Sequence, residues 1–132
     1  MPHAIRIHET GGAEVLRWDE FDAGTPGPGE VRLRQTAIGA NFLDIYHRAG
    51  THHMPLDPLP AVPGVEGAGV VEAVGTGVAE VEAGDRVAYP ITVGSYAEIR
   101  IIPAAQLVPL PDEVADDVAA AVILKGLTAE VL

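Results

Sequence analysis

Polar and hydrophobic positions alternate along much of the chain up to about residue 111, which is the pattern of short strands with one buried face. The clearest case is the segment 30–37, where Val31, Leu33 and Gln35 fall on one side and charged or polar residues on the other. Short clusters of Gly and Pro separate such segments and favour turns over long helices. We therefore predict a mostly β fold for this part of the chain.

Further strands are predicted around this segment. Residues 4–8 should pair with 15–18 as a hairpin, because Gly11 and Gly12 lie between them. The other candidates lie at 67–75, within 82–90 after a turn, and at 94–102. The small residues and glycines of 67–77 indicate tight bends, as at the corners of a β-barrel.

The pattern changes to a helical one in AIGANFLDIYHRAG, residues 37–50. Asn41 can cap a helix that Gly50 ends, and Asp44 at the third helical position favours the N-terminal dipole. Asp44 also precedes Arg48 by four residues, a spacing that allows an ion pair. The apolar side of this helix consists of Phe42, Ile45, Tyr46 and Ala49. On local evidence a capped amphipathic helix explains the segment without any active site.

A second helix is predicted near the C-terminus. Residues 112–132 lose the turn-forming residues and gain alanine and leucine, with acidic residues at their start. The stretch 118–124 is apolar nearly all round, as in a helix buried on several sides. We interpret residues 112–132 as a helical connector whose apolar surface needs a partner.

Composition narrows the class of protein. A length of 132 residues suits one domain, and 8 Lys and Arg against 19 Asp and Glu give a net charge of −11. This charge disfavours nucleic acid and anionic membranes as partners. The sequence has no cysteine, no signal-peptide core and no apolar run of about 18 residues, so we expect a cytoplasmic protein without disulfides.

Six separated motifs point to a family. They are HETGGAEVL at 8–16, AIGANFLDIYHRAG at 37–50, VPGVEGAGVVEAVGTGV at 62–78, AGDRVAY at 83–89, GSYAE at 94–98 and LKGLTA at 124–129. In order and spacing they resemble the N-terminal catalytic domain of the zinc-free, zeta-crystallin-like quinone oxidoreductases of the medium-chain dehydrogenase/reductase superfamily. The resemblance covers residues 1–132 and implies a GroES-like β-barrel with short helices.

In that family the barrel packs against a Rossmann domain, and the two domains form the walls of the nicotinamide cleft. The chain contains no Gly-rich dinucleotide fingerprint between a strand and a helix, since GVEGAG lies inside a β segment. We therefore expect the Rossmann domain to follow residue 132, after the connector. The isolated chain should then show little or no turnover.

The resemblance also bears on zinc. Zinc alcohol dehydrogenases of the superfamily have a cysteine at the position of Asn41 and a His-Glu pair at Val65-Glu66, and the Val65 side chain cannot bind zinc. A competing zinc site would draw on His47, His52, His53, Asp44 or Glu66. Adjacent histidines in an extended loop usually point apart, so we interpret the chain as metal-free and Glu66 as a structural carboxylate.

The chemistry that the resemblance implies is hydride transfer from NADPH to a quinone. Asn41 and Tyr46 are the candidate catalytic residues, the first as a hydrogen-bond donor and the second as part of the ligand pocket. The candidate cofactor-binding residues are Asn41, Asp44, Tyr46, Arg48, Lys125 and Thr128. His52 stands near a tyrosine position of the family and is a candidate for the substrate pocket. Each residue also has an ordinary structural explanation, such as a helix cap or a surface ion pair.

Two other functions stay open at this point. Superfamily relatives reduce enones or aldehydes, so the acceptor could be one of these. Alternatively the chain could be a stand-alone, non-enzymatic GroES-like module that binds a partner through its C-terminal helix. Self-association into a homo-oligomer is also left open.

Overall fold

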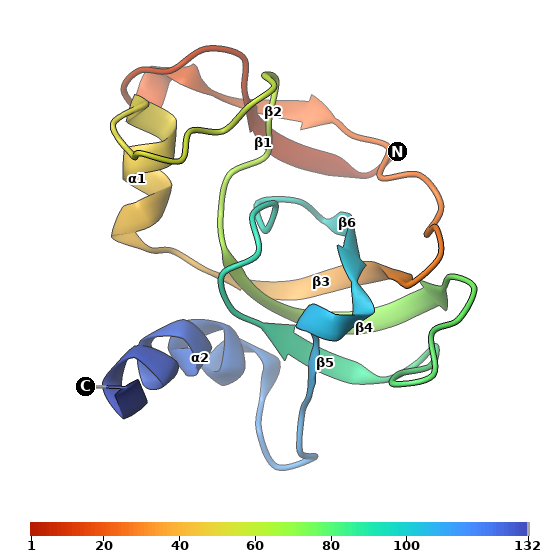
Figure 1. Cartoon of the computed structure of the whole chain (residues 1–132). Helices are drawn as coiled ribbons and strands as arrows, with labels where there is room; N and C mark the ends of the chain where they lie inside the picture. Colours follow the sequence, from red (N-terminus) through yellow and green to blue (C-terminus); the bar gives the residue numbers. More distant parts are fainter. Residues whose placement is uncertain (132) are drawn as a thin grey trace.

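The computed structural model describes residues 1–131 and consists mostly of strands in two antiparallel sheets (Figure 1). The smaller sheet pairs β1 (His3–Ile7) with β2 (Leu16–Glu20), which follows the short 3-10 helix η1 (Ala13–Val15). The larger sheet has the strand order β6-β3-β4-β5-β7. Its strands are β3 (Glu30–Gly39), β4 (Glu66–Val74), β5 (Arg86–Tyr89), β6 (Ile99–Pro103) and β7 (Val108–Pro109), with η2 (Ala104–Gln106) before β7. The predicted hairpin and the mostly β fold are confirmed.

Two isolated bridges join β1 to segments outside the named strands, one between Ala4 and Ala97 and one between Ile7 and Ala61. The predicted strand at 94–102 is shorter than expected, since β6 begins at Ile99. The reason is that the residues before it bond to other loops. The N–H groups of residues 94 and 95 both donate to the carbonyl of Gly64, at 2.8 and 3.2 Å.

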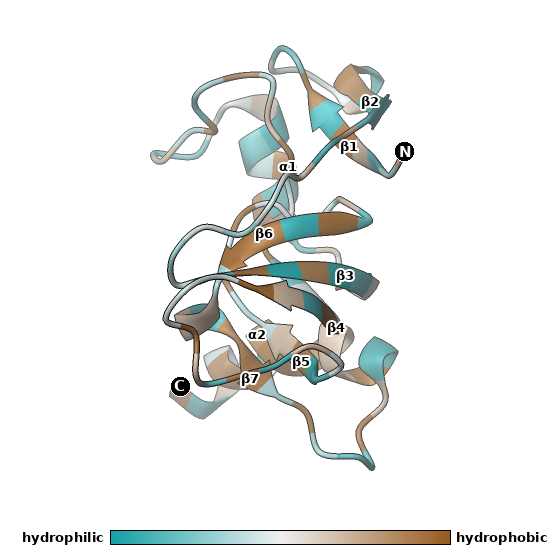
Figure 2. Cartoon of the chain, turned by 90° about the vertical axis from the view of Figure 1, so that its right-hand side faces the viewer, coloured by the Kyte–Doolittle hydropathy of each residue, from teal (hydrophilic) through white to brown (hydrophobic). Residues whose placement is uncertain are grey.

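The core lies against one face of the larger sheet. Val31 and Leu33 of β3 are fully buried, as their alternation predicted, and Figure 2 shows the matching bands of hydrophilic and hydrophobic residues along β3. The other members of this buried cluster are Val71, Val81, Val87, Tyr89, Ile102, Ala104 and Leu107. Burial of these side chains is the main driving force for the fold.

The first helix, α1 (Phe42–Ala49), has the bounds that the sequence predicted. Gly50 ends it with a φ of 78°, a left-handed conformation that glycine adopts without strain. An ordinary amphipathic helix buries its apolar side, but this helix buries polar side chains and exposes its apolar ones. Asp44 and His47 are buried, whereas Phe42 is 77% exposed and Ile45 and Tyr46 are also exposed.

The second helix, α2 (Asp116–Val131), begins four residues later than the predicted connector. Its small residues Ala119 and Ala120 pack on Ala68 and Ala88 of the sheet. The exposed side includes Val118, Val122, Leu127 and Val131, so within residues 1–131 this helix is buried only where it packs on the sheet. No helix within residues 1–131 is long and apolar enough to cross a membrane.

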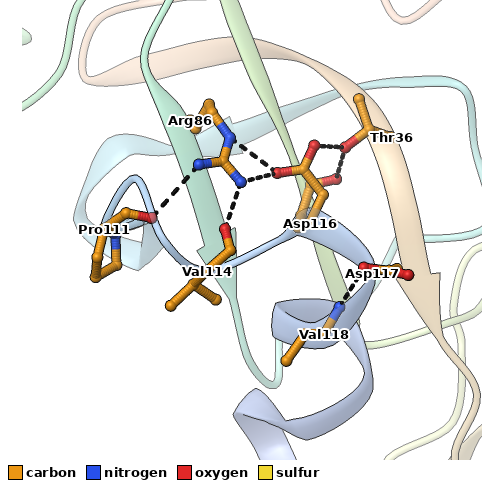
Figure 3. A network of polar contacts seen from close by, with 8 residues as sticks. Thr36, Arg86, Pro111, Val114, Asp116, Asp117 and Val118 are labelled. Carbon is orange, nitrogen blue, oxygen red and sulfur yellow. Dashed lines mark hydrogen bonds and ion pairs between the residues drawn. The ribbon is translucent and has the colours of Figure 1, made fainter.

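A polar network holds the start of α2 on the sheet (Figure 3). Asp116 accepts hydrogen bonds from Nε and Nη2 of Arg86, at 3.1 and 2.7 Å, and from Oγ1 of Thr36 at 2.7 Å. Arg86 Nη2 also donates to the carbonyl of Val114 at 2.6 Å. The hydrogen bond from the Thr36 hydroxyl lowers the pKa of Asp116. Burial opposes this shift, and the Arg86 guanidinium adds to it, so the pKa stays below its usual value.

Candidate active site

A cavity of about 480 Å³ lies beside the N-terminus of α1, and we call it the Asn41 cavity. Its walls come from β2, the connection from β3 into α1, α1 itself, the loops around residues 63 and 96, and α2. The lining residues are Leu16, Ala40, Asn41, Phe42, Asp44, Ile45, Arg48, Pro63, Tyr96 and Lys125. Its volume lies within the range of about 300–1,000 Å³ that is usual for small-molecule sites.

Glu66 of β4 connects the parts of this site, although its side chain is fully buried. Oε1 accepts from Nδ2 of Asn41 at 3.0 Å and from Nζ of Lys125 at 3.2 Å. Oε2 accepts from the backbone N–H of Leu124 at 2.8 Å. Lys125 Nζ also donates to Oδ1 of Asn41 at 3.1 Å. The buried carboxylate is thus paired and hydrogen-bonded, which is the condition for keeping a charge in the interior.

Gly39 lets this cluster form. A Cβ atom built on Gly39 would overlap the Glu66 carboxylate and the backbone carbonyl of Ala120. The close approach of β3 to α2 and to Glu66 therefore requires glycine at this position.

Asp44 is the second buried carboxylate of the site. Its Oδ2 accepts the backbone N–H of Asn41 at 3.0 Å, which starts α1 in a capping-box arrangement, and the hydroxyl of Tyr96 at 2.6 Å. Burial and this hydrogen bond to a carboxylate raise the pKa of the Tyr96 hydroxyl. Oδ1 of Asp44 is buried without a hydrogen-bond partner in the described chain, so an acceptor is left over beside the cavity.

Arg48 closes the other end of α1. Its Nε donates to the carbonyl of Gly11 at 3.3 Å, and the N–H of Gly11 donates to the carbonyl of Arg48 at 3.0 Å. The expected ion pair between Asp44 and Arg48 does not form among residues 1–131. Asp44 instead bonds to the local backbone and to Tyr96.

The structure gathers some of the predicted site residues and leaves others apart. Four of the candidates, Asn41, Asp44, Arg48 and Lys125, line the cavity. The described lining does not include Tyr46, His52 or Thr128. The Thr128 hydroxyl donates to the carbonyl of Leu124 at 2.9 Å within its own helix, and Tyr46 is half-exposed on α1.

One residue of the site, Tyr96, was not among the predicted candidates. Tyr96 belongs to the GSYAE motif, but its partner Asp44 lies 52 positions away, so no local pattern predicted the contact. Glu66, which was predicted to be a structural carboxylate, is fully buried and accepts hydrogen bonds from Asn41 and Lys125.

The three histidines near α1 gather more closely than expected. The ring centroids of His52 and His53 are 4.3 Å apart, and those of His47 and His52 are 5.0 Å apart. The rings meet because the chain bends here, where Nδ1 of His52 accepts the N–H of Met54 at 3.1 Å. Across residues 1–131 no group of three or more His, Cys, Asp or Glu residues has a geometry that could hold a metal ion.

The fold and the match to a family model together show which protein family the chain belongs to. Residues 27–112 match the model of the alcohol dehydrogenase GroES-like domain. The chain belongs to this family. The relatives of this GroES-like chain include the quinone oxidoreductase of Pseudomonas aeruginosa, 46% identical over 133 residues, and the 2-haloacrylate reductase of a Burkholderia species, 46% identical over 136 residues. Both alignments include 100% of the chain and 40% or 41% of the relative.

A solved structure agrees with this result. The Escherichia coli quinone oxidoreductase complexed with NADPH is 41% identical and superposes with a TM-score of 0.91, over 96% of this chain and 38% of that one. The resemblance to quinone oxidoreductases of the medium-chain superfamily is confirmed. The GroES-like chain spans about two fifths of the length of these relatives.

Proposed function

We propose that the GroES-like chain provides the acceptor-binding wall of an NADPH-dependent quinone oxidoreductase that works without zinc. The observation that carries the proposal is the cluster of Asn41, Glu66 and Lys125 at a cavity of ligand size. Quinone oxidoreductases among the relatives, one of them solved with NADPH, support the choice of reaction.

Hydrogen-bond donors at the cavity suit a carbonyl ligand. Lys125 has three N–H donors, and two of them bond to Asn41 and Glu66. Asn41 uses one of its two amide N–H groups, on Glu66. One donor of each side chain is left over. A quinone oxygen could accept both hydrogen bonds, which would hold the ring in one orientation.

Electrostatics favours the same ligand. NADPH, when bound, supplies the hydride. A quinone oxygen gains negative charge as its ring is reduced, and the ammonium group of Lys125 stabilises that charge. Glu66 holds Lys125 in position through the buried hydrogen bond.

The donor set argues against zinc at Asn41. The amide nitrogen of Asn41 donates to Glu66, and its oxygen accepts from Lys125. A cation placed there would meet the ammonium group of Lys125. Orientation by hydrogen bonds is therefore the role that we assign to this position.

A second acceptor class has its own support. The 2-haloacrylate reductase among the relatives acts, by its name, on an activated carbon–carbon double bond. Such an acid has a carboxylate that Lys125 or Arg48 could bind, whereas a neutral quinone has none. A binding assay that compares a quinone with a 2-haloacrylate distinguishes the two acceptor classes, because it shows which of them binds in the Asn41 cavity.

Titration of a benzoquinone into the 132-residue chain, followed by isothermal titration calorimetry, tests the proposal. We expect saturable binding that Asn41→Ala and Lys125→Met each weaken at least tenfold, about 1.4 kcal/mol. The matched control is Arg17→Met, because it removes one positive charge from an exposed position that does not line the Asn41 cavity. Circular dichroism checks that each variant folds. Absence of quinone binding at millimolar concentration would contradict the proposal and favour a partner-binding module, for which the exposed apolar side of α2 is the relevant surface.

A further inference from the structure

A second cavity, of about 430 Å³, lies between the small sheet and β3 and is called the Trp18 cavity here. Its apolar lining comes from Ile5, Trp18, Ala37, Ile38 and Ala97. Trp18 is 61% exposed and Ile38 46% exposed, so the lining is accessible from solvent. An exposed apolar cavity is more often a binding site than other parts of a protein surface are.

The two cavities are neighbours. Tyr96 lines both cavities, and its hydroxyl donates a hydrogen bond to Asp44. Leu16 lines the first cavity and Trp18 the second, and residues two apart on a strand point to the same side. The segment from β3 into α1 likewise contributes Ala40 to the Asn41 cavity and Ile38 to the Trp18 cavity.

The cavities differ in charge. Arg48 and Lys125 give the Asn41 cavity two cationic side chains. The described lining of the Trp18 cavity contains Glu98 and no Lys or Arg. A phosphate-bearing cofactor is disfavoured there, because nothing compensates its charge and Glu98 repels it. A neutral apolar group suits this lining better.

We propose that the Trp18 cavity binds an apolar substituent of the acceptor whose reactive ring occupies the Asn41 cavity. The preferred acceptors are then quinones that carry an alkyl or prenyl chain. This inference rests on the proposed function, because the ring must first be bound in the Asn41 cavity.

The test compares two benzoquinones with the same ring substituents, one with a ten-carbon chain and one with a methyl group in its place. Binding to the 132-residue chain is measured by isothermal titration calorimetry. Each buried methylene strengthens binding about fourfold, so partial burial of the chain predicts at least tenfold tighter binding of the long quinone.

Variants separate the cavity from unspecific adhesion of the alkyl chain. Ile38→Asp should reduce the advantage of the long quinone to less than threefold. Val108→Asp is the matched control, because Val108 is 47% exposed and lies in β7 away from both cavities, and it should keep the tenfold advantage. Trp18→Ser provides a second variant on another strand, should Ile38→Asp fail to fold.

Equal affinity for the two quinones would overturn the inference and leave the proposed function intact. An advantage that neither Ile38→Asp nor Trp18→Ser reduces would also overturn it. Absence of binding by both quinones would overturn the inference and the proposed function together.

Discussion

Strand β3 and helix α1 follow each other in the chain and bury opposite kinds of side chain. The strand buries Val31 and Leu33, whereas the helix buries Asp44 and His47 and exposes Phe42. The difference lies in what each element faces. The strand faces an apolar core, while α1 faces the Tyr96 hydroxyl and backbone carbonyls. An apolar stripe therefore shows which residues of a helix lie together, but not whether that side faces the protein or a ligand.

The largest expected effect compares truncations on the two elements. Leu33→Ala should lower the free energy of unfolding by about 2–5 kcal/mol, because it leaves a cavity in a packed core. Ile45→Ala, on the exposed side of α1, should change it by about 0.5 kcal/mol or less. Urea unfolding followed by circular dichroism measures both. Similar losses for the two variants would show that the apolar side of α1 is part of the core after all.

A smaller effect is expected from the polar contacts that hold α1. Tyr96→Phe removes the donor at 2.6 Å from Asp44 and leaves that buried carboxylate short of a partner. The expected loss is about 1–3 kcal/mol in the same unfolding experiment. Tyr46→Phe is the control, because the Tyr46 side chain is half-exposed, and it should have little effect. An unchanged stability of the Tyr96 variant would mean that α1 is held by other contacts.

The smallest effect concerns pH. Burial, together with nearby His52, lowers the pKa of His47 below its value of 6.5, although Asp44 opposes the shift. As the pH falls through about 6.5, the unfolded chain binds the proton first, so stability should fall until the pH passes the lower folded-state pKa. Unfolding at pH 8 and pH 5 measures the change. His47→Gln should reduce this dependence, whereas exposed His53→Gln should retain it. The same slope in both variants would assign the effect to other groups.

The sequence predicted the elements better than their contacts. The bounds of α1 followed from Asn41 and Gly50, and the buried side of β3 from its alternation, because both signals are local. Four of the proposed cofactor-binding residues line one cavity, a grouping that came from the resemblance to a family rather than from spacing.

The remaining features depend on contacts between distant positions. Glu66 meets Asn41 and Lys125 across 25 and 59 positions, so no window of sequence contains the cluster. The exposed side of α1 was equally invisible, because the polar groups that bind its other side come from Gly11 and Tyr96. Such contacts are set by tertiary packing, which overrides the local pattern.

The hydrogen bond from the Leu124 amide to Glu66 also affects how the molecule opens. This amide lies within α2, yet its partner is a buried side chain of β4. Fraying of the helix end alone does not release it, since the carboxylate stays in place as long as the sheet is intact. The Leu124 amide is therefore tied to β4 as well as to its own helix, and we expect its hydrogen to exchange with solvent only when helix and sheet separate.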